Sequence, residues 1–374
     1  TPTPTPTPTG TFPAAAIGKY SGFLDQADSG KVRGVLTMTA SAAGSLSARI
    51  DEAGAVYAFS KTGVKGDGNG GFAASLVSSG KVLEIAVDSN GILTGTFSTG
   101  SRVFARRANL TNIKGFSGYY TSVLDVQDVT PNSDQFDNRP KGAGYLTFTV
   151  STSGVAKYSG LLADGAKVSG SANVMLFSGA ELSALGYSVS ADRNYACFPV
   201  YSALYSKRGL VAGLVWVDGG DLSTTAADNQ VLLTGSNWTY PGKTTVPGDG
   251  FTATFDTVAF TLIGAYYGGG QNLAATYAGT SLYVTEDGVG APVLASGLTL
   301  TVASGNGYGE TLRASASTGL FSGTFKRMST SGRLASVKYA GALVPAIREA
   351  GGYYLVSEQI SGVQVSRSKK VDIR

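Results

Sequence analysis

The chain has 374 residues, a formal net charge of +4, no histidine and a single cysteine, Cys197, and only 14% of its residues are charged. Without histidine there is no Ser-His-Asp triad and no histidine-ligated zinc, and one cysteine excludes an intrachain disulfide. No apolar run reaches the roughly eighteen residues of a membrane-spanning helix, and the scattered cations do not form the basic stripe of a nucleic-acid-binding protein.

The first residues, TPTPTPTPT, predict an extended polyproline II segment because proline fixes φ and restricts its neighbour. We assign residues 1–16 to this Thr/Pro-rich segment. Two interpretations stay open, a stiff linker and an arm that contacts another subunit. The contact residues of such an arm would be Thr1, Pro2, Pro4, Pro6 and Pro8.

Three similar stretches then follow one another. In residues 144–165, Leu146, Phe148 and Val150 alternate with polar residues, and a turn at Ser151–Gly154 precedes a second alternating run, which predicts a β-hairpin. LTMTASAAG from Leu36 and LTLTVASG from Leu298 repeat the pattern. We therefore predict three β-meander units, over residues 17–115, 116–270 and 271–374.

The second unit carries an Asp-rich insertion, DVQDVTPNSDQFDNRPKG. Its oxygen-bearing side chains are weak candidates for a Ca²⁺ site, namely Asp125, Asp128, Asn132, Asp134 and Asp137. The insertion lacks the dense alternating ligands and the central glycine of a calcium loop, and Asp and Asn are ordinary loop formers. We therefore predict no metal site and no cofactor, and we interpret the insertion as a solvated loop.

Four aromatic residues of the second unit, Tyr201, Tyr205, Trp216 and Trp238, have two interpretations. Core or rim packing is the one we favour, because aromatic side chains dominate such cores. A platform on which sugars stack is the alternative. Cys197 lies near Tyr195 and Phe198, and a buried, inert thiol is expected there.

No catalytic residue is predicted. The acidic pairs Asp51-Glu52 and Glu286-Asp287 lie beside glycines, where solvated turn carboxylates are expected. GDGNGG at residues 66–71 lacks the Lys-Ser/Thr of a phosphate loop and reads as a turn. The C-terminal RSKKVDIR predicts a charged terminal strand or tail, and a basic arm for another subunit, with Arg367, Lys369 and Lys370, is the alternative.

Four segments carry a resemblance: GYLTFTVSTSGVAKYSGLLADGAKVSGSANV, FPVYSALYSKRGLVAGLVWV, LLTGSNWTY and LFSGTFKRMSTSGRLASVKYAGALVPAIREAGGYYLV. In this order they resemble the β-rich C-terminal regions of large secreted or cell-surface proteins of verrucomicrobial and related bacteria. The resemblance spans most of Ile17 to Val363 and implies a fold and an extracellular or cell-surface location. Its motifs are structural, so it implies no catalytic residue. The Asp-rich insertion and the long stretch before Cys197 depart from the pattern.

We therefore predict an all-β protein with little helix, in which antiparallel meanders form two or three packed barrels or sandwiches, since closure removes exposed strand edges. The expected function is that of a non-catalytic structural or adhesive surface protein. Its partners would be further copies of itself, in a fibre or layer, or other surface proteins and polysaccharide. A carbohydrate-binding module is the alternative. An outer-membrane β-barrel is less favoured, because many predicted strands are short and the last residue is Arg.

Overall fold

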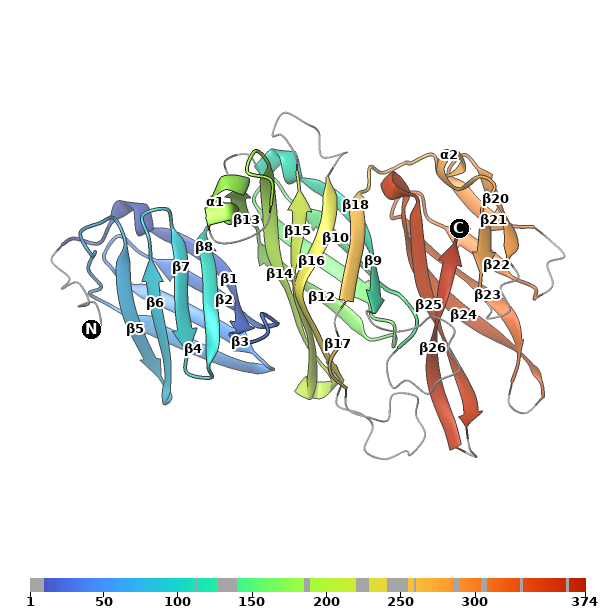
Figure 1. The fold of residues 1–374 in the computed structure, drawn as a ribbon, viewed down its shortest axis with the longest axis horizontal. Coiled ribbons are helices and arrows are strands. Elements are labelled where there is room, and N and C mark those ends of the chain that lie inside the picture. The colour runs from blue at the N-terminus through green and yellow to red at the C-terminus, as the bar shows by residue number, and fades with distance from the viewer. Residues whose placement is uncertain are drawn as a thin grey trace.

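The strands follow directly from the alternation of apolar and polar residues. The computed structural model describes residues 10–109, 111, 113–126, 140–184, 189–219, 229–240, 255–258, 260–284, 290–303, 308–329, 332–360 and 363–374. Its strands form three antiparallel, nearly closed, barrel-like sheets (Figure 1). The prediction of an all-β fold with little helix is confirmed.

The first barrel has the strand order β4-β3-β2-β1-β8-β7-β6-β5. Its strands are β1 (Gly18–Gln26), β2 (Val32–Ala40), β3 (Leu46–Glu52), β4 (Ala55–Lys61), β5 (Phe72–Ser78), β6 (Lys81–Val87), β7 (Ile92–Phe97) and β8 (Ser101–Arg107). The first and last strands pair with each other, and β4 lies beside β5 where the barrel nearly closes. A short 3₁₀ helix, η1 (Ala14–Ala16), precedes β1.

The second barrel has the order β12-β11-β10-β9-β18-β16-β15-β14-β13, and β17 pairs with β16. Its elements are η2 (Ile113–Phe116), β9 (Gly118–Val126), β10 (Gly144–Val150), β11 (Val155–Leu161), β12 (Lys167–Asn173), β13 (Met175–Ser178), α1 (Gly179–Ala184), β14 (Asn194–Leu204), η3 (Tyr205–Lys207), β15 (Gly209–Asp218), β16 (Gln230–Tyr240), β17 (Phe255–Val258) and β18 (Phe260–Tyr266). The predicted hairpin is β10 and β11, with Leu146, Phe148 and Val150 buried.

The third barrel has the order β21-β20-β19-β26-β25-β24-β23-β22. Its elements are α2 (Leu273–Tyr277), β19 (Ser281–Tyr283), β20 (Ala291–Ser296), β21 (Thr299–Val302), β22 (Thr311–Ala314), β23 (Leu320–Met328), β24 (Leu334–Val344), η5 (Pro345–Ile347), β25 (Glu349–Ile360) and β26 (Val363–Ile373). In every barrel the first strand therefore pairs with the last, as expected for diverged copies of one meander.

The first two barrels also share the way in which their first strand begins. The hydroxyl of Tyr20 donates to the carbonyl of Ala16, and the hydroxyl of Tyr120 donates to the carbonyl of Phe116, both at 2.8 Å. Both tyrosines are fully buried, so each hydrogen bond fixes a 3₁₀ turn against the barrel end.

The barrel interiors are filled by side chains. Buried aromatic rings occupy all three, for example Phe72 and Phe97 in the first, Phe148 and Phe198 in the second and Phe325 in the third. A residual cavity inside the second barrel, lined by Leu146, has a volume of only about 20 Å³. The barrels are therefore packed cores.

The three barrels stand side by side in a row in chain order (Figure 1). The first and second meet through an apolar cluster on their outer faces. Phe23 of β1 and Val32 of β2 pack there against Phe177 of β13 and Trp216 of β15. Arg106 of β8 adds an ion pair to Glu181 of α1.

The second and third barrels meet through smaller residues. Val123 of β9 and Ala143, just before β10, pack with Val344 at the end of β24. Backbone groups join the barrels directly: the amide of Ala143 donates to the carbonyl of Gly352 at 3.1 Å. The hydroxyl of Thr121 donates to the carbonyl of Leu343 at 2.7 Å.

Candidate functional site

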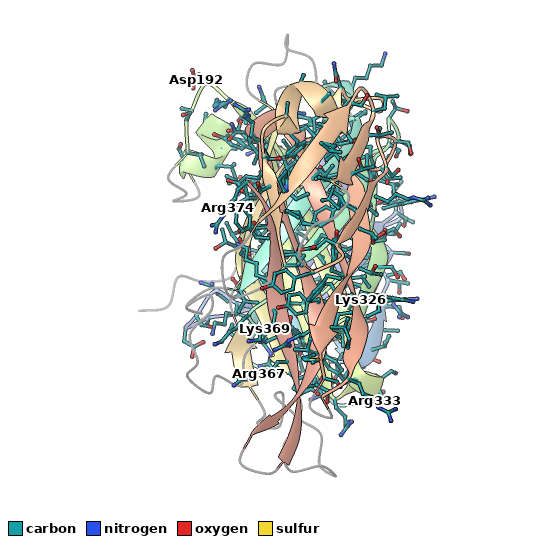
Figure 2. The ribbon with its side chains drawn as sticks, turned by 90° about the vertical axis from the view of Figure 1, so that its right-hand side faces the viewer. Asp192, Lys326, Arg333, Arg367, Lys369 and Arg374 are labelled. Atoms are coloured by element: carbon teal, nitrogen blue, oxygen red, sulfur yellow. The ribbon has the colours of Figure 1, made fainter. Side chains whose placement is uncertain are left out.

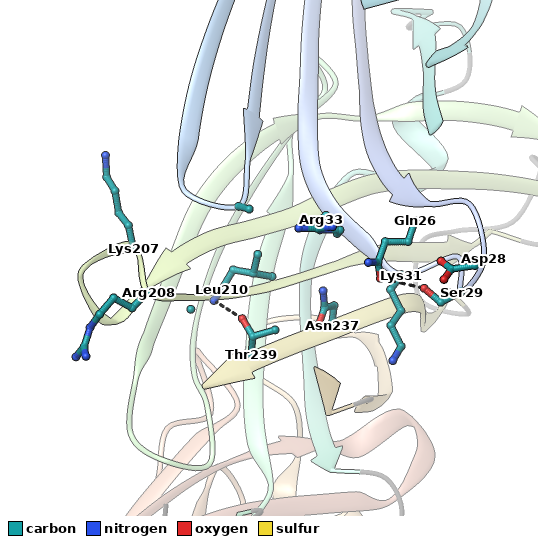
Figure 3. Close-up of a pocket in the computed structure, with 12 residues that line it drawn as sticks. Gln26, Asp28, Ser29, Lys31, Arg33, Lys207, Arg208, Leu210, Asn237 and Thr239 are labelled. Carbon is teal, nitrogen blue, oxygen red and sulfur yellow. Dashed lines mark hydrogen bonds between the residues drawn. The ribbon is translucent and has the colours of Figure 1, made fainter. Parts of the chain in front are cut away.

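A polar hollow lies between the first and second barrels (Figure 3). It has a volume of about 480 Å³, within the usual range of small-molecule sites. One wall is the β1–β2 turn with the start of β2, and the other is the η3 turn with β15 and β16. The residues are Gln26, Asp28, Ser29, Lys31, Arg33, Ala53, Lys207, Arg208, Gly209, Leu210, Asn237 and Thr239. We call this hollow the inter-barrel cleft.

The η3 turn is held by one half-buried side chain, that of Tyr205. Three consecutive residues, Tyr205, Ser206 and Lys207, have positive φ of 53°, 57° and 68°. The hydroxyl of Tyr205 donates to Oδ2 of Asp164 at 2.6 Å and accepts the indole N–H of Trp238 at 2.9 Å. Burial, and then the charge of Asp164, raise the pKa of this hydroxyl far above its usual value. The ring thus anchors a strained turn that carries Lys207 and Arg208.

The floor of the inter-barrel cleft is fixed by contacts between the barrels. The side-chain amide of Asn237 donates to the carbonyl of Val32 at 3.3 Å, and the amide of Gly54 donates to the hydroxyl of Tyr201 at 2.7 Å. Gly235 has a φ of 58°, and a Cβ at this position would lie 2.8 Å from the carbonyl oxygen of Gly30. The junction of the two barrels beside the inter-barrel cleft therefore requires a glycine at this close approach.

Asn237 is only 2% exposed, and its Oδ1 has no hydrogen-bond partner in the described part of the chain. Beside it, Thr239 accepts the amide N–H of Leu210 at 3.0 Å. A buried amide oxygen without a donor is uncommon, because an unsatisfied polar group costs about 1–3 kcal/mol. The floor thus offers an unused acceptor.

The inter-barrel cleft is positively charged. Four of the side chains that line it are cationic, Lys31, Arg33, Lys207 and Arg208, and one is a carboxylate, Asp28. Among the described residues, no carboxylate comes within salt-bridge distance of these four cations. Figure 3 shows Arg33 above Asn237 in the middle, and Lys207 and Arg208 on the opposite rim, with side chains that point outward. The arrangement favours an anionic ligand.

The four aromatic residues considered for sugar stacking do not form an exposed platform. Trp238 is fully buried and stacks on Phe260 inside the second barrel, and Trp216 is 9% exposed and faces the first barrel. Tyr201 and Tyr205 are half-buried and both hydroxyls are hydrogen-bonded. The packing interpretation therefore describes these residues, and the two tryptophans have no free face for a sugar.

Of the Ca²⁺ candidates, Asp128, Asn132, Asp134 and Asp137 lie outside the described residues. The acidic pair Glu286-Asp287 also lies outside them. The side chain of Asp125 contacts β26, where one of its carboxylate oxygens lies 3.4 Å from Nζ of Lys370. In the parts of the chain that the structure describes, no three acidic or cysteine side chains gather as metal ligands would.

Glu52, which was expected to be a solvated turn carboxylate, is instead buried and accepts a hydrogen bond from the hydroxyl of Ser101, which corrects that prediction.

The basic C-terminal residues belong to β26, which pairs with β25 and β19. Figure 2 shows Arg367 and Lys369 along this strand. Lys369 is 5% exposed, and Lys370 faces Asp125 of the second barrel. The segment is therefore a terminal strand, as predicted, and a contact with another subunit through Arg367, Lys369 and Lys370 stays a prediction. The arm residues Thr1, Pro2, Pro4, Pro6 and Pro8 lie outside the described residues.

Cys197 is fully buried in the apolar cluster between the first two barrels, and burial raises the pKa of its thiol. This confirms the expected burial.

None of the helices in the described parts of the chain has the length and hydropathy that a bilayer crossing requires.

The residues of the inter-barrel cleft were not found from the sequence. Arg33 and Asn237 are 204 positions apart, and the only motif that includes either residue is the glycosylation sequon Asn237-Trp238-Thr239, which does not indicate a cleft. The only local signal is the Lys207-Arg208 pair after the PVYSALYS segment.

No protein-family model matches the chain, and no curated protein matches its sequence. Among solved structures, the chain is similar to a protein of unknown function from the DUF3598 family of Nostoc punctiforme, with 11% identity, a TM-score of 0.18, and coverage of 67% of this chain and 96% of that one. It is also similar to isotype 1 transferrin binding protein B of serogroup B Neisseria meningitidis, with 12% identity, a TM-score of 0.19, and coverage of 94% and 68%. Similarities of this size do not identify a function.

Proposed function

We propose that this is a non-catalytic extracellular structural protein, a rigid row of barrels that associates end to end with further copies of itself. The single observation that supports it is that both junctions in the chain use the same two faces. The first and second strands of one barrel (β1 and β2, then β9 and β10) pack on strands from the second half of the next (β14 to β16, then β24 and β25).

An interface between two different faces repeats without closing, because each added unit leaves the same pair of faces free at the ends. At the N-terminal end, the free face is the outer side of β5, β6 and β7. It is a shallow groove of about 500 Å³ lined by small residues, among them Ala73, Ala86 and Gly95. The junction between the second and third barrels likewise places Gly351 against Val123.

At the C-terminal end, the free face includes β19 and β20 of the third barrel. Leu294 on β20 is 54% exposed and Leu298 in the following turn is 50% exposed. Apolar side chains of this size occupy the corresponding strands at the first junction, where Val32 of β2 is buried against the second barrel. We propose that Leu294 and Leu298 dock into the groove of the next copy.

The location outside the cell or at its surface is part of the same proposal. It is supported by the likeness of the strand motifs to secreted bacterial proteins. The filled interior of the second barrel also favours a mechanical role, since its residual cavity of about 20 Å³ is too small for a ligand.

Light scattering after size-exclusion chromatography, over a range of concentrations, tests the association, and electron microscopy shows its geometry. We expect linear chains of the full-length protein at high concentration. Ala86→Arg places a charge in the groove and should abolish them. Ala43→Arg, in the exposed β2–β3 turn of the same barrel, is the matched control and should leave them unchanged. A monomer at every concentration, or equal association of both variants, would contradict the proposal.

A further inference from the structure

We infer that the inter-barrel cleft binds an acidic saccharide, a sugar that carries a carboxylate or sulfate group. This inference does not depend on end-to-end association, since the cleft lies inside one chain and both of its walls are present in the monomer.

The four cationic side chains of the inter-barrel cleft indicate that its ligand carries an acidic group. Lys31 and Arg33 are half-buried on the wall from the first barrel, and Lys207 and Arg208 are exposed on the rim from the second. A partly enclosed cleft strengthens the field of such charges, because field lines concentrate in a low-dielectric hollow. The guanidinium of Arg33 is suited to a planar carboxylate or to a sulfate, to which it can donate two parallel hydrogen bonds.

The sugar is indicated by the neutral side chains. The unused acceptor Oδ1 of Asn237 requires a donor, and a simple oxyanion has none to offer. Because Oδ1 itself is fully buried, a sugar hydroxyl donates to it only if a neighbouring side chain shifts when the ligand binds. Thr239 accepts a backbone N–H and retains its own hydroxyl proton for the ligand, and Gln26 and Ser29 supply further polar groups. The set combines charge recognition with hydroxyl recognition.

A nucleic acid is also polyanionic, but the side chains that line the inter-barrel cleft include no aromatic ring. Single-stranded nucleic acids are bound mainly by stacking of their bases on such rings beside a cationic groove. The lining therefore favours the saccharide.

The inter-barrel cleft is preorganised. The bond from Asn237 to Val32 and the bond from Gly54 to Tyr201 hold the two walls together, and the apolar cluster beneath them fixes the relative position of the barrels. The free-energy cost of ordering the site on binding is consequently small, which favours measurable affinity for a short oligosaccharide.

Calorimetric titration of the full-length protein tests the inference with probes of matched length. Oligogalacturonate carries carboxylates, a heparin fragment carries sulfates, and maltotetraose is the neutral control. Inorganic sulfate and oligothymidylate complete the set. We expect binding of at least one acidic oligosaccharide, weakened by salt, and none of maltotetraose. The two acidic probes distinguish the carboxylate from the sulfate.

Arg33→Gln and Lys207→Gln should each weaken that binding about tenfold, the equivalent of one charge-assisted hydrogen bond. Arg49→Gln is the control, because Arg49 is an exposed cation of the same barrel outside the inter-barrel cleft. Equal affinity in Arg33→Gln and the parent protein would overturn the inference. So would binding of neither acidic oligosaccharide, binding of inorganic sulfate with the same affinity, or tighter binding of oligothymidylate.

Discussion

Nη2 of Arg106 lies 2.6 Å from Oε1 of Glu181, and this ion pair crosses the boundary between the first and second barrels. The side chain of Arg106 is 8% exposed, and the carbon of its guanidinium lies 4.6 Å from the centre of the Phe177 ring. Because the charge of Arg106 is buried, it depends on its partner more than a surface cation does.

Glu181→Gln should therefore lower the free energy of unfolding by about 2 kcal/mol, since it removes a charge-assisted hydrogen bond from a buried guanidinium. Asp25→Asn is the matched control, because Asp25 pairs with Arg102, which is 52% exposed. That change should cost less than about 1 kcal/mol. Urea unfolding followed by circular dichroism measures both. Equal losses of unfolding free energy in the two variants would show that the Arg106–Glu181 pair contributes no more to stability than the exposed Arg102–Asp25 pair.

The Arg106–Glu181 ion pair also makes the stability of the protein depend on pH. Burial raises the pKa of Glu181, but hydrogen bonds from Arg106 and Ser178 and the charge of Arg106 outweigh it, so the pKa lies below its usual 4.5. A lowered carboxyl pKa contributes stability above the unfolded value, and that contribution is lost as the pH falls through the folded value. The difference in melting temperature between the parent protein and Glu181→Gln should be full at neutral pH and should shrink below the usual pKa. A constant difference down to strongly acidic pH would contradict this.

Tyr205→Phe should destabilise the second barrel by about 1–3 kcal/mol, because it removes an acceptor of the buried indole N–H of Trp238 and a donor to Asp164. Tyr57→Phe serves as the control, since the described residues place no hydrogen-bond partner at the Tyr57 hydroxyl and its ring packs on Phe97 in either form. Thermal unfolding compares the two. If both variants melt alike, the hydroxyl of Tyr205 does not anchor the η3 turn.

Gly18 and Gly118 occupy the same place in two barrels, with φ of 146° and 145°. In Gly18→Ala, the added Cβ would lie 3.2 Å from the flexible side chain of Arg107, so the loss should be about 1–2 kcal/mol, from the backbone. In Gly118→Ala, the Cβ would overlap the ring of Tyr266, so overpacking should add about 1 kcal/mol or more. Chemical unfolding of both variants should rank Gly118→Ala lower, and the reverse order would contradict the role of the ring.

The thiol of Cys197 should be unreactive in the folded protein, because it is fully buried and burial raises its pKa. Ellman's reagent should label it slowly in buffer and rapidly in concentrated urea. Rapid labelling in buffer would show that the first two barrels separate readily in solution.

Local chemistry determined the strands. The alternation of Leu146, Phe148 and Val150, and the turn at Ser151–Gly154, placed a hairpin where β10 and β11 lie, because strand periodicity and turn formation depend on neighbouring residues. Composition likewise indicated an all-β chain with little helix. The repeat of the LTMT-type segments led to three units, and the structure has three barrel-like sheets.

Only the tertiary structure decided how the barrels meet and what their junctions contain. Trp216 packs between the first two barrels and Trp238 lies inside the second, although the two stand on neighbouring strands, β15 and β16. The inter-barrel cleft joins Arg33 and Asn237 from opposite walls of a junction. Such pairings depend on which outer faces bury each other, and a strand pattern specifies only that alternate residues share a face.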